Sequence, residues 1–380
     1  NNKVRGFMDE KLRIIISGGG TGGHIFPAVS IANAIRAKYP DAEILFVGAL
    51  GRMEMQRVPA AGYKIVGLPI CGFDRKNMLK NVSVLFKIWK SQRMARDVIR
   101  KFRPMAAVGV GGYASGPTLN ECAKHGIPCL IQEQNSYAGV TNKILAKKVD
   151  RICVAYDGME RFFPADKIIK TGNPVRQALL ENNMTKAEAL RTFGLDEGKK
   201  TVLIVGGSLG ARTMNESVLA HLDDIRDSGV QFIWQTGKYY NASINEQLKG
   251  RTDLPMLKVM DFISDMGAAY KAADLVISRA GASSISEFCL IGKPVILVPS
   301  PNVAEDHQTK NAMALVDKDA ALYVSDADAP AQVIGLALKT VKDDARLGSL
   351  AVNIRKLGLP DSADVIADEV VRLAREKAKK

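Results

Sequence analysis

The chain has 380 residues, of which 47% are hydrophobic and 6% aromatic, and its formal net charge is +13. This length favours two domains over a single core, and no apolar stretch approaches the roughly 20 residues that span a bilayer. The polar segment 1–13 lacks the apolar core of a signal peptide, so we expect a cytoplasmic protein.

The positive charge is confined to the first half of the chain. Residues 1–172 hold 27 basic against 13 acidic residues, whereas residues 173–380 hold 26 against 27. No nucleic-acid-binding module is visible, which argues against a nucleic-acid partner. The five cysteines and four histidines show no metal-ligand spacing, so the sequence predicts reduced thiols, no metal site and no cofactor.

Strands alternate with helices along the first half, as is typical of a mostly parallel sheet. The predicted strands cover 12–16, 43–48, 64–68, 106–110, 128–132 and 151–155, and the predicted helices cover 26–38, 52–61, 78–102, 116–125 and 139–148. Turn formers at 171–176 predict a hinge. Strands then recur near 201–205, 231–235, 256–259, 274–277, 294–298 and 321–324, and a charged helix over 361–377 ends the chain.

Three predicted strands break into glycine-rich turns that open a helix, at 17–24, 111–117 and 206–211. Glycine lets the main chain approach a ligand closely, and the N–H groups of a helix N-terminus attract phosphate. The three turns therefore predict two nucleotide-type domains facing each other across a cleft. The second strand ends without the acidic residue of an NAD site, and no Gly-Lys-Ser/Thr of a P-loop follows any turn.

His24 ends the first glycine turn, where a helix begins. The positive end of a helix dipole disfavours imidazolium, and a neutral imidazole suits a general base. The alternative is that His24 caps its own helix.

Polar clusters follow two buried strands of the second half. Segment 279–287 opens a helix with small residues, which predicts a phosphate site with Glu287 reaching a ribose; alternatively, Ser284 and Glu287 form a capping box. Segment 305–312 either binds sugar hydroxyls or is a solvated helix start. Asp326-Ala327-Asp328 has the form of a glycosyltransferase metal motif, but Pro330 follows it, so helix capping explains it better.

A lysine-flanked apolar stripe lies in the most basic segment, 74–103. Its members are Leu79, Val82, Phe86 and Trp89, with Lys80, Lys87 and Lys90 beside them. The stripe either faces the core and leaves a basic back in solvent, or lies on an anionic lipid surface.

Together these motifs resemble the bacterial peptidoglycan N-acetylglucosaminyltransferases that convert lipid I to lipid II. The resemblance begins near Lys11, covers nearly the whole chain, and rests on six markers in the family's order: 18–24, 109–117, 132–135, 171–176, 206–208 and 279–287.

The resemblance implies an α/β fold of the GT-B type, with two Rossmann-like domains facing across a cleft. Residues 1–173, joined by a returning C-terminal helix 361–380, would bind the acceptor and the membrane, and residues 174–360 would bind the UDP-sugar. The donor would be UDP-N-acetylglucosamine and the acceptor lipid I, undecaprenyl-pyrophosphoryl-N-acetylmuramoyl-pentapeptide. Transfer would invert the anomeric carbon without a metal, at the cytoplasmic face of the inner membrane, alongside cell-wall synthesis and division proteins.

The resemblance also assigns site residues, and it places His24, the candidate catalytic base, facing the acceptor. Those for the donor are Thr21, Gly22, Gly23, Asn135, Arg176, Ser208, Ile263, Ser283, Ser284, Glu287, His307 and Gln308, of which Asn135 also faces the acceptor. Those for the acceptor are Gly19, Gly20, Gly111, Gly112, Tyr113 and Ser115. Two alternatives stay open: a non-hydrolysing UDP-N-acetylglucosamine 2-epimerase of the same fold, and a non-catalytic protein that binds nucleotide sugars or anionic lipid.

Overall fold

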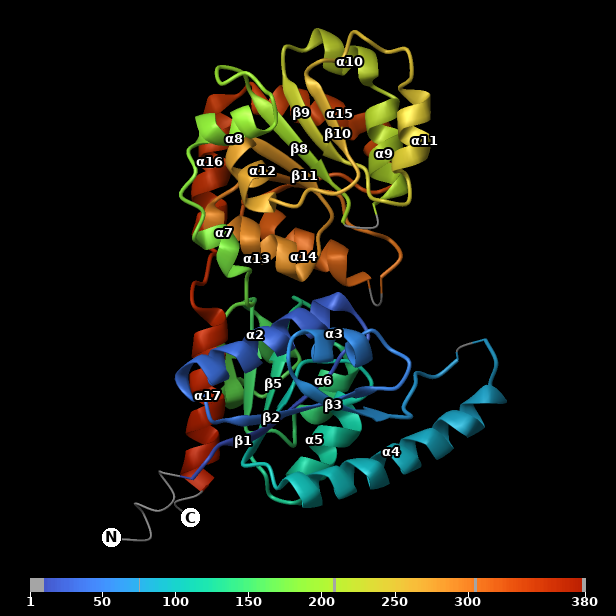
Figure 1. Cartoon of the computed structure of the whole chain (residues 1–380), viewed down its shortest axis with the longest axis vertical. Helices are drawn as coiled ribbons and strands as arrows, with labels where there is room; N and C mark the ends of the chain where they lie inside the picture. Colours follow the sequence, from blue (N-terminus) through green and yellow to red (C-terminus); the bar gives the residue numbers. More distant parts are fainter. Residues whose placement is uncertain (1–9, 75, 208–209, 304–305, 378–380) are drawn as a thin grey trace. The chain divides into compact units, whose positions relative to one another are not determined.

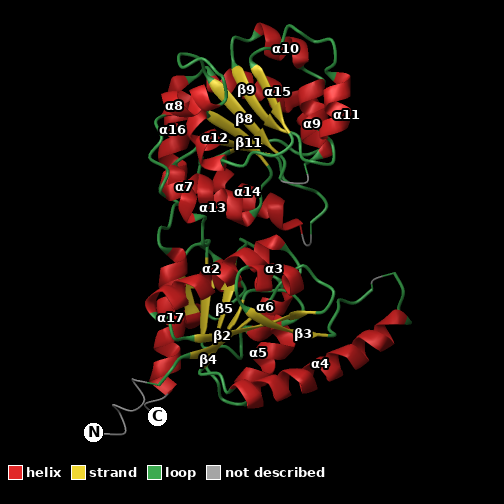
Figure 2. Cartoon of the chain, in the orientation of Figure 1, coloured by secondary structure: helices red, strands yellow, loops and turns green. Residues whose placement is uncertain are grey.

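The computed structural model describes residues 10–74, 76–207, 210–303 and 306–377, which form two compact α/β units (Figures 1 and 2). Unit 1 comprises Asn1–Pro174 and Pro360–Lys380, and unit 2 comprises Val175–Leu359. The division between the units falls within the segment 171–176 where the sequence predicts a hinge.

The described part of unit 1 contains a parallel sheet of seven strands in the order β3-β2-β1-β4-β5-β6-β7. The strands are β1 (Arg13–Ser17), β2 (Glu43–Ala49), β3 (Lys64–Leu68), β4 (Ala106–Gly109), β5 (Cys129–Glu133), β6 (Arg151–Val154) and β7 (Ile168–Lys170). Alternate side chains of a strand point to opposite faces. Ile14 and Ile16 of β1 accordingly pack in one core, and Ile15 packs in the other.

Helices cover both faces of this sheet. One core contains side chains of α2 (Gly22–Lys38), α3 (Glu54–Ala60) and α17 (Ser362–Lys377). The other contains side chains of α4 (Lys80–Phe102), α5 (Ser115–Lys124) and α6 (Val140–Leu145). A sheet buried on both faces needs apolar residues at nearly every strand position, which explains the continuous apolar runs in the sequence.

Unit 2 repeats the plan with six described strands in the order β10-β9-β8-β11-β12-β13. They are β8 (Thr201–Val205), β9 (Gln231–Gln235), β10 (Leu257–Met260), β11 (Leu275–Ser278), β12 (Val295–Leu297) and β13 (Leu322–Tyr323). Its helices are α7 (Gln177–Leu180), α8 (Lys186–Thr192), α9 (Arg212–Leu219), α10 (Leu222–Asp227), α11 (Asn241–Gln247), α12 (Met266–Ala272), α13 (Ala282–Ile291), α14 (His307–Val316), α15 (Ala329–Val341) and α16 (Asp344–Arg355).

The predicted strands are confirmed, with ends that differ by no more than one residue. The three-residue strand β7 was not predicted. Helix α2 begins four residues before the predicted helix, because its first turn contains Gly22 and Gly23, which have poor helix propensity and read as a loop. His24 therefore lies in the first turn of α2.

The strand order places the ends of particular strands next to each other. In an open α/β sheet, ligands bind beyond the carboxyl ends of the strands where the order reverses. That point lies between β1 and β4 in unit 1 and between β8 and β11 in unit 2. All three predicted glycine turns, and the segment 279–287, follow one of these four strands.

Helix α17 packs against α2 and β4, although more than 200 residues separate it from β4 (Figure 2). Ile366, Val370 and Leu373 of α17 are buried in the same core as β1. An ion pair of 2.6 Å between Lys38 of α2 and Asp368 joins the two helices at the surface. The last helix is therefore part of the hydrophobic core of unit 1.

The docking of α17 can be tested with two neighbouring residues. Ile366 is completely buried, whereas Val365 is 42% exposed. Replacing Ile366 with Ala should lower the free energy of unfolding by about 2–5 kcal/mol, because it leaves a cavity in the core. The matched Val365→Ala change should alter it by no more than about 0.5 kcal/mol. Urea unfolding of the full chain measures both, and equal effects would contradict this packing.

Candidate functional site

Unit 2 contains a cavity of about 700 Å³ at the carboxyl ends of its strands. Glycines 206, 207 and 210 of the turn after β8 form one wall, and Arg279, Gly281 and Ser284 after β11 form another. Four predicted donor residues line it: Arg176, Ile263, Ser284 and Gln308. A nucleotide-sized ligand fits such a volume. Ser208 lies outside the described residues.

Gln235, at the end of β9, joins two walls of this cavity. Its side-chain oxygen accepts the N–H of Ile263 at 2.9 Å, and its side-chain nitrogen donates to the carbonyl of Gly207 at 3.0 Å. The side chain is almost fully buried. Gln235 was not predicted from the sequence, because a polar residue at the end of an apolar strand is its only local signal.

Arg176 and Glu287 form a bidentate ion pair beside the cavity. The Nε and Nη2 atoms of Arg176 donate to the two oxygens of Glu287 at 2.7 and 2.8 Å. The hydroxyl of Tyr270, also missed from the sequence, donates to Glu287 at 3.4 Å. The hydrogen bonds to Glu287 raise the pKa of Arg176, and burial raises that of Tyr270. The Glu287 carboxylate is thus held in a fixed orientation by two residues that line the cavity, Arg176 and Tyr270.

The start of α13 lines the cavity through Gly281 and Ser284. Gly281 is the N-cap, with extended backbone angles and no side-chain cap, and Ser283 and Ser284 follow in the first turn. The capping-box interpretation of Ser284 and Glu287 is therefore wrong, because both residues lie inside the helix and Glu287 bonds Arg176 instead. The first N–H groups of a helix have no partner within the helix, so they can bind an anion.

Gln308, beside His307 in the first turn of α14, fastens two loops at the cavity. Its side-chain oxygen accepts the N–H groups of Ala280 at 3.2 Å and Ser300 at 2.9 Å. It therefore holds the entry to α13 against the loop after β12. Gln308 thus belongs to the cavity lining, whereas Asp306 is exposed at the start of α14 and residue 305 lies outside the described residues.

Asp326 of the Asp-x-Asp sequence is engaged inside the cavity. It accepts hydrogen bonds from Arg279 at 2.6 Å and from the hydroxyl of Thr213 at 3.1 Å. Asp328 occupies the N-cap position of α15 with Pro330 in the first turn, as the sequence predicts, although its side chain makes no cap hydrogen bond. Asp326 balances the charge of Arg279. Across the described residues, no group of three or more His, Cys, Asp or Glu side chains is arranged to hold a metal ion.

In unit 1 the two glycine turns interlock at the point where the strand order reverses. The N–H of Gly19 donates to the carbonyl of Gly111 at 3.1 Å. A Cβ on Gly18 would lie 2.4 Å from the Gly111 carbonyl, and one on Gly112 would lie 2.5 Å from the Gly19 carbonyl. Gly18, Gly19, Gly111 and Gly112 all have positive φ angles. Only glycine permits this backbone and this approach.

The His24 ring lies over both turns. Its Nδ1 is 2.7 Å from the carbonyl of Gly19, and a Cβ on Gly111 would lie 2.8 Å from its Nε2. A carbonyl can only accept a hydrogen bond, so Nδ1 holds the proton and the lone pair of the neutral ring lies on Nε2. The N-cap of α2 is Thr21, so the interpretation of His24 as a helix cap is wrong.

Glu54, the first residue of α3, lies beneath the first glycine turn and is 1% exposed. One carboxylate oxygen accepts the N–H of Gly20 at 2.9 Å, and the other accepts the N–H of Ala49 at 2.9 Å. A Cβ on Gly19 would lie 2.3 Å from the carboxyl carbon. The N–H groups of Gly19 and Gly20 are therefore bonded within the protein, to Gly111 and Glu54.

The remaining predicted residues of unit 1 lie on neighbouring loops. The Ser115 hydroxyl donates to Gly112 at 3.0 Å and closes the second glycine turn. Tyr113 is half-exposed, with the Arg52 guanidinium 5.7 Å from its ring centroid. Asn135 begins a loop whose N–H groups at Asn135 and Gly139 bind the buried Glu133, at 3.2 and 2.7 Å. Burial raises the pKa of Glu133.

The apolar stripe of α4 lies on the surface. Leu79, Val82, Phe86 and Trp89 are 85%, 69%, 62% and 54% exposed. The core-facing interpretation of the stripe is therefore wrong. Another side of α4 is buried, through Val84, Ser91, Ala95 and Ile99. The first turns of α4 project beyond the sheet of unit 1 (Figure 1). Within the described residues, no helix has the length and apolar character needed to cross a membrane.

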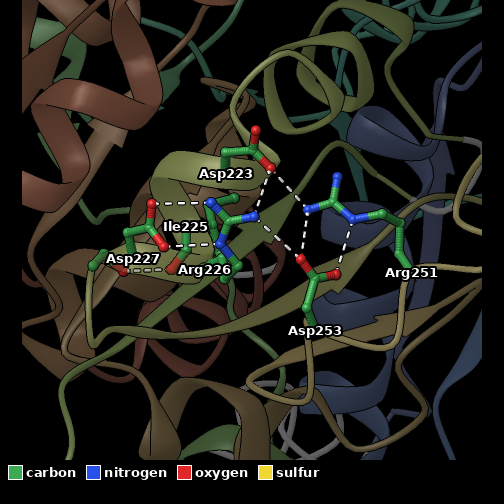
Figure 3. A network of polar contacts seen from close by, with 7 residues as sticks. Asp223, Ile225, Arg226, Asp227, Arg251 and Asp253 are labelled. Carbon is green, nitrogen blue, oxygen red and sulfur yellow. Dashed lines mark hydrogen bonds and ion pairs between the residues drawn. The ribbon is translucent and has the colours of Figure 1, made fainter.

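A second charged cluster in unit 2 lies away from the cavity, between α10 and the loop before β10 (Figure 3). Arg226 binds Asp223, Asp227 and Asp253, and Arg251 binds Asp223 and Asp253. Arg251 lowers the pKa of Asp253 to about 2. These residues precede β9 and β10 and so lie near the amino ends of the strands, where they join two surface segments.

Comparison with known proteins identifies both units. Residues 14–154 match the glycosyltransferase family 28 N-terminal domain and residues 201–365 the corresponding C-terminal domain. A UDP-N-acetylglucosamine–N-acetylmuramyl-(pentapeptide) pyrophosphoryl-undecaprenol N-acetylglucosamine transferase of Phocaeicola vulgatus is 69% identical, over 97% of this chain and 98% of its own length.

Two solved structures share the fold. The crystal structure of Acinetobacter baumannii MurG has a TM-score of 0.77 at 27% identity, over 95% of this chain and 99% of that one. A UDP-N-acetylglucosamine 2-epimerase has a TM-score of 0.63 at 13% identity, over 95% and 96% of the two chains. The predicted α/β fold of the GT-B type is thus confirmed.

The position of the His24 ring can be tested at Gly111. Gly111→Ala should displace the ring, because the new Cβ would meet Nε2, and should move the His24 imidazole signals in NMR spectra. Gly51→Ala is the matched control, since Gly51 also has a positive φ but open space around its Cβ among the described residues. Both changes should cost about 1–2 kcal/mol of stability from backbone strain. Unmoved His24 signals in Gly111→Ala would contradict this geometry.

Proposed function

This chain belongs to glycosyltransferase family 28, and we propose that it transfers N-acetylglucosamine from UDP-N-acetylglucosamine to lipid I and so forms lipid II. The observation that carries the proposal is the 69% identity, over nearly the full length, to a transferase whose name states this reaction. The transfer inverts the anomeric carbon and needs no metal ion.

The donor binds in the cavity of unit 2. Arg176 and Tyr270 hold the Glu287 carboxylate, whose free lone pairs accept hydrogen bonds from the ribose hydroxyls. Ile263 contacts the nucleobase at the opposite wall. The N–H groups of Ser283 and Ser284 at the start of α13 bind the diphosphate. His307 and Gln308 contact the sugar, and the resemblance adds Ser208 to the phosphate site.

We expect UDP to leave without a metal ion, because the cavity already contains the positive charge of Arg279, which Asp326 holds in place. The leaving diphosphate gains negative charge as its bond to the sugar breaks. Helix N-termini and main-chain N–H groups already aimed at that position stabilise the charge without rearranging. The carboxylate of Asp326 accepts hydrogen bonds from Arg279 and Thr213, and it therefore serves as their partner rather than as a metal ligand.

His24 acts as the general base. Its Nε2 takes the proton of the acceptor hydroxyl while that oxygen attacks the anomeric carbon from the side opposite UDP. One displacement of this kind converts the α-linked donor into a β-linked product. Gly19, Gly20, Gly111, Gly112, Tyr113 and Ser115 form the acceptor site, and Thr21, Gly22, Gly23 and Asn135 lie beside it in unit 1.

The α4 stripe attaches unit 1 to the cytoplasmic face of the plasma membrane. Its exposed apolar side chains can enter the lipid interface, while Lys80, Lys87 and Lys90 contribute on the order of 1 kcal/mol each at an anionic surface. The lipid-linked acceptor is anchored in that surface. Proteins of cell-wall synthesis and division would be partners there.

Incubation with UDP-N-acetylglucosamine and a short-chain lipid I analogue should release UDP and give a β-linked disaccharide by NMR. The rate should be unchanged when EDTA replaces divalent cations. His24→Gln should slow transfer by about 100-fold or more. A requirement for magnesium, or an α-linked product, would refute the mechanism.

The same assay without acceptor separates the alternatives. A 2-epimerase would convert UDP-N-acetylglucosamine alone, which a time course by NMR would show. A non-catalytic binding protein would bind the nucleotide and give no turnover with any acceptor. Either result would overturn the proposed transfer reaction.

Membrane attachment is tested with Phe86→Glu combined with Trp89→Glu. Binding to vesicles that contain anionic lipid should weaken by roughly tenfold or more, because two exposed aromatic side chains are lost from the interface. Affinity for UDP should not change. Val352→Glu is the control, since Val352 is similarly exposed (57%) on α16 of unit 2. Equal vesicle binding by the double variant and the control would contradict the role of the stripe.

A further inference from the structure

We propose that Glu54 is a positioning residue for His24 and acts through the single peptide group between Gly19 and Gly20. The two ends of that peptide have different partners. Its N–H donates to a Glu54 oxygen at 2.9 Å, and its carbonyl accepts the Nδ1 proton of His24 at 2.7 Å. Carboxylate, peptide and imidazole thus form one hydrogen-bonded chain. The inference rests on the proposed role of His24 as base.

The Glu54 carboxylate is fixed in place by its surroundings. Its second oxygen accepts the N–H of Ala49 at 2.9 Å, and the side chain is 1% exposed. A Cβ on Gly19 or Gly48 would lie 2.3 or 2.5 Å from its carboxyl and Cγ carbons. Two main-chain donors, one at each oxygen, match an ionised carboxylate, which only accepts hydrogen bonds.

The charge reaches the imidazole because a peptide group is conjugated. A hydrogen bond from its N–H to a carboxylate shifts electron density towards its carbonyl oxygen, and hydrogen bonds in a chain strengthen one another. The Gly19 carbonyl therefore becomes a better acceptor for Nδ1–H. This favours the tautomer with the lone pair on Nε2.

The chain also stabilises the charged ring formed in the reaction. As the acceptor oxygen bonds to the anomeric carbon, its proton moves to Nε2, and the bond to UDP breaks with its electron pair leaving on UDP. The imidazolium then keeps Nδ1–H on the Gly19 carbonyl, next to the negative charge of Glu54. Glu54 acts in this way without contacting the substrate.

Two arginines at the same end of the sheet carry positive charge, which opposes the stabilisation of the charged His24 ring by Glu54. Arg57 of α3 faces the first turn of α2, with Nη1 3.2 Å from the position of a Cβ on Gly22, and Arg52 lies over the Tyr113 ring. Neither bonds the Gly19–Gly20 peptide, whose N–H and carbonyl are taken by Glu54 and His24. In the described part of unit 1, Glu54 is the acidic group linked to His24 through this peptide.

The test is an NMR titration of His24 in the full chain labelled with ¹⁵N-histidine, with its signals assigned from His24→Gln. The wild type should show the proton on Nδ1. Glu54→Gln should lower the pH midpoint of the His24 titration by roughly 0.5 to 1 unit, since a negative charge that favours the charged ring is lost. It should also increase the fraction of the other tautomer.

Glu133→Gln is the matched control for this titration. Glu133 is equally buried and also binds two main-chain N–H groups, at Asn135 and Gly139, but it is not bonded to the Gly19–Gly20 peptide. The His24 midpoint should stay in place in this variant. An equal shift in both variants, or no shift in Glu54→Gln, would overturn the proposal.

A second variant, Gly48→Ala, keeps the negative charge of Glu54 but displaces the carboxylate. Gly48→Ala places a Cβ against Cγ of Glu54 and should displace the carboxylate from Gly20, so the midpoint should fall as in Glu54→Gln. If Glu54→Gln does not fold, Gly48→Ala tests the proposal in its place. An unchanged His24 midpoint in Gly48→Ala would refute the hydrogen-bonded link between Glu54 and His24.

Kinetics separate this inference from the proposed function. Glu54→Gln should lower kcat by about tenfold and move the acid limb of the pH–rate profile to lower pH, with KM for UDP-N-acetylglucosamine unchanged. If His24→Gln keeps full transfer activity while Glu54→Gln still shifts the titration, the chain exists and the assignment of the base is wrong. If Glu54→Gln loses activity but leaves the His24 titration unshifted, Glu54 only stabilises the loop and the proposal is wrong.

Discussion

The close approach of two backbone turns, possible only without a Cβ, is the constraint on which unit 1 depends. Gly18 and Gly19 touch Gly111 and Gly112 because β1 and β4 are neighbours with parallel directions. This contact fixes the Gly19–Gly20 peptide, and that peptide orients both His24 and Glu54. A methyl group at any of the four glycines would collide with main chain, with the His24 ring or with the Glu54 carboxylate.

Most of the fold could be predicted from the sequence because both sheets are parallel and buried on both faces. Their strands are continuous apolar runs bounded by turn formers, such as Ile14–Ile16 or Val202–Val205. Strand β7 was not predicted because its two apolar residues, Ile168 and Ile169, stand between Lys167 and Lys170 and form no apolar run. The docking of α17 on α2 has no local signal, since amphipathic spacing shows that a helix packs and not what it packs against.

The parts of the candidate site that could be predicted are those where glycine or small residues lie between a strand and a helix. Buried side chains that hold the site residues through hydrogen bonds could not be predicted. Gln235, Tyr270 and Glu54 each make a hydrogen bond to a group that lies far away in the sequence: to Ile263, Glu287 and Gly20, respectively. Each lies in an ordinary strand or helix context. Glu54 is hidden most completely, as a first-turn glutamate is expected from the helix dipole alone. Its burial and its bond to Gly20 appear only when β1, β2 and α3 are brought together.

The glycine turns of the two units have different surroundings, and we expect them to have different roles. In unit 1 the N–H groups of Gly18, Gly19 and Gly20 donate to Val47, Gly111 and Glu54, and a buried carboxylate lies below them. A negative charge there favours an imidazole ring that becomes positive. In unit 2 the turn after β8 faces a cavity that contains Arg279 and the start of α13. We therefore expect the leaving diphosphate to bind in unit 2, and the first glycine turn of unit 1 to serve the proton transfer.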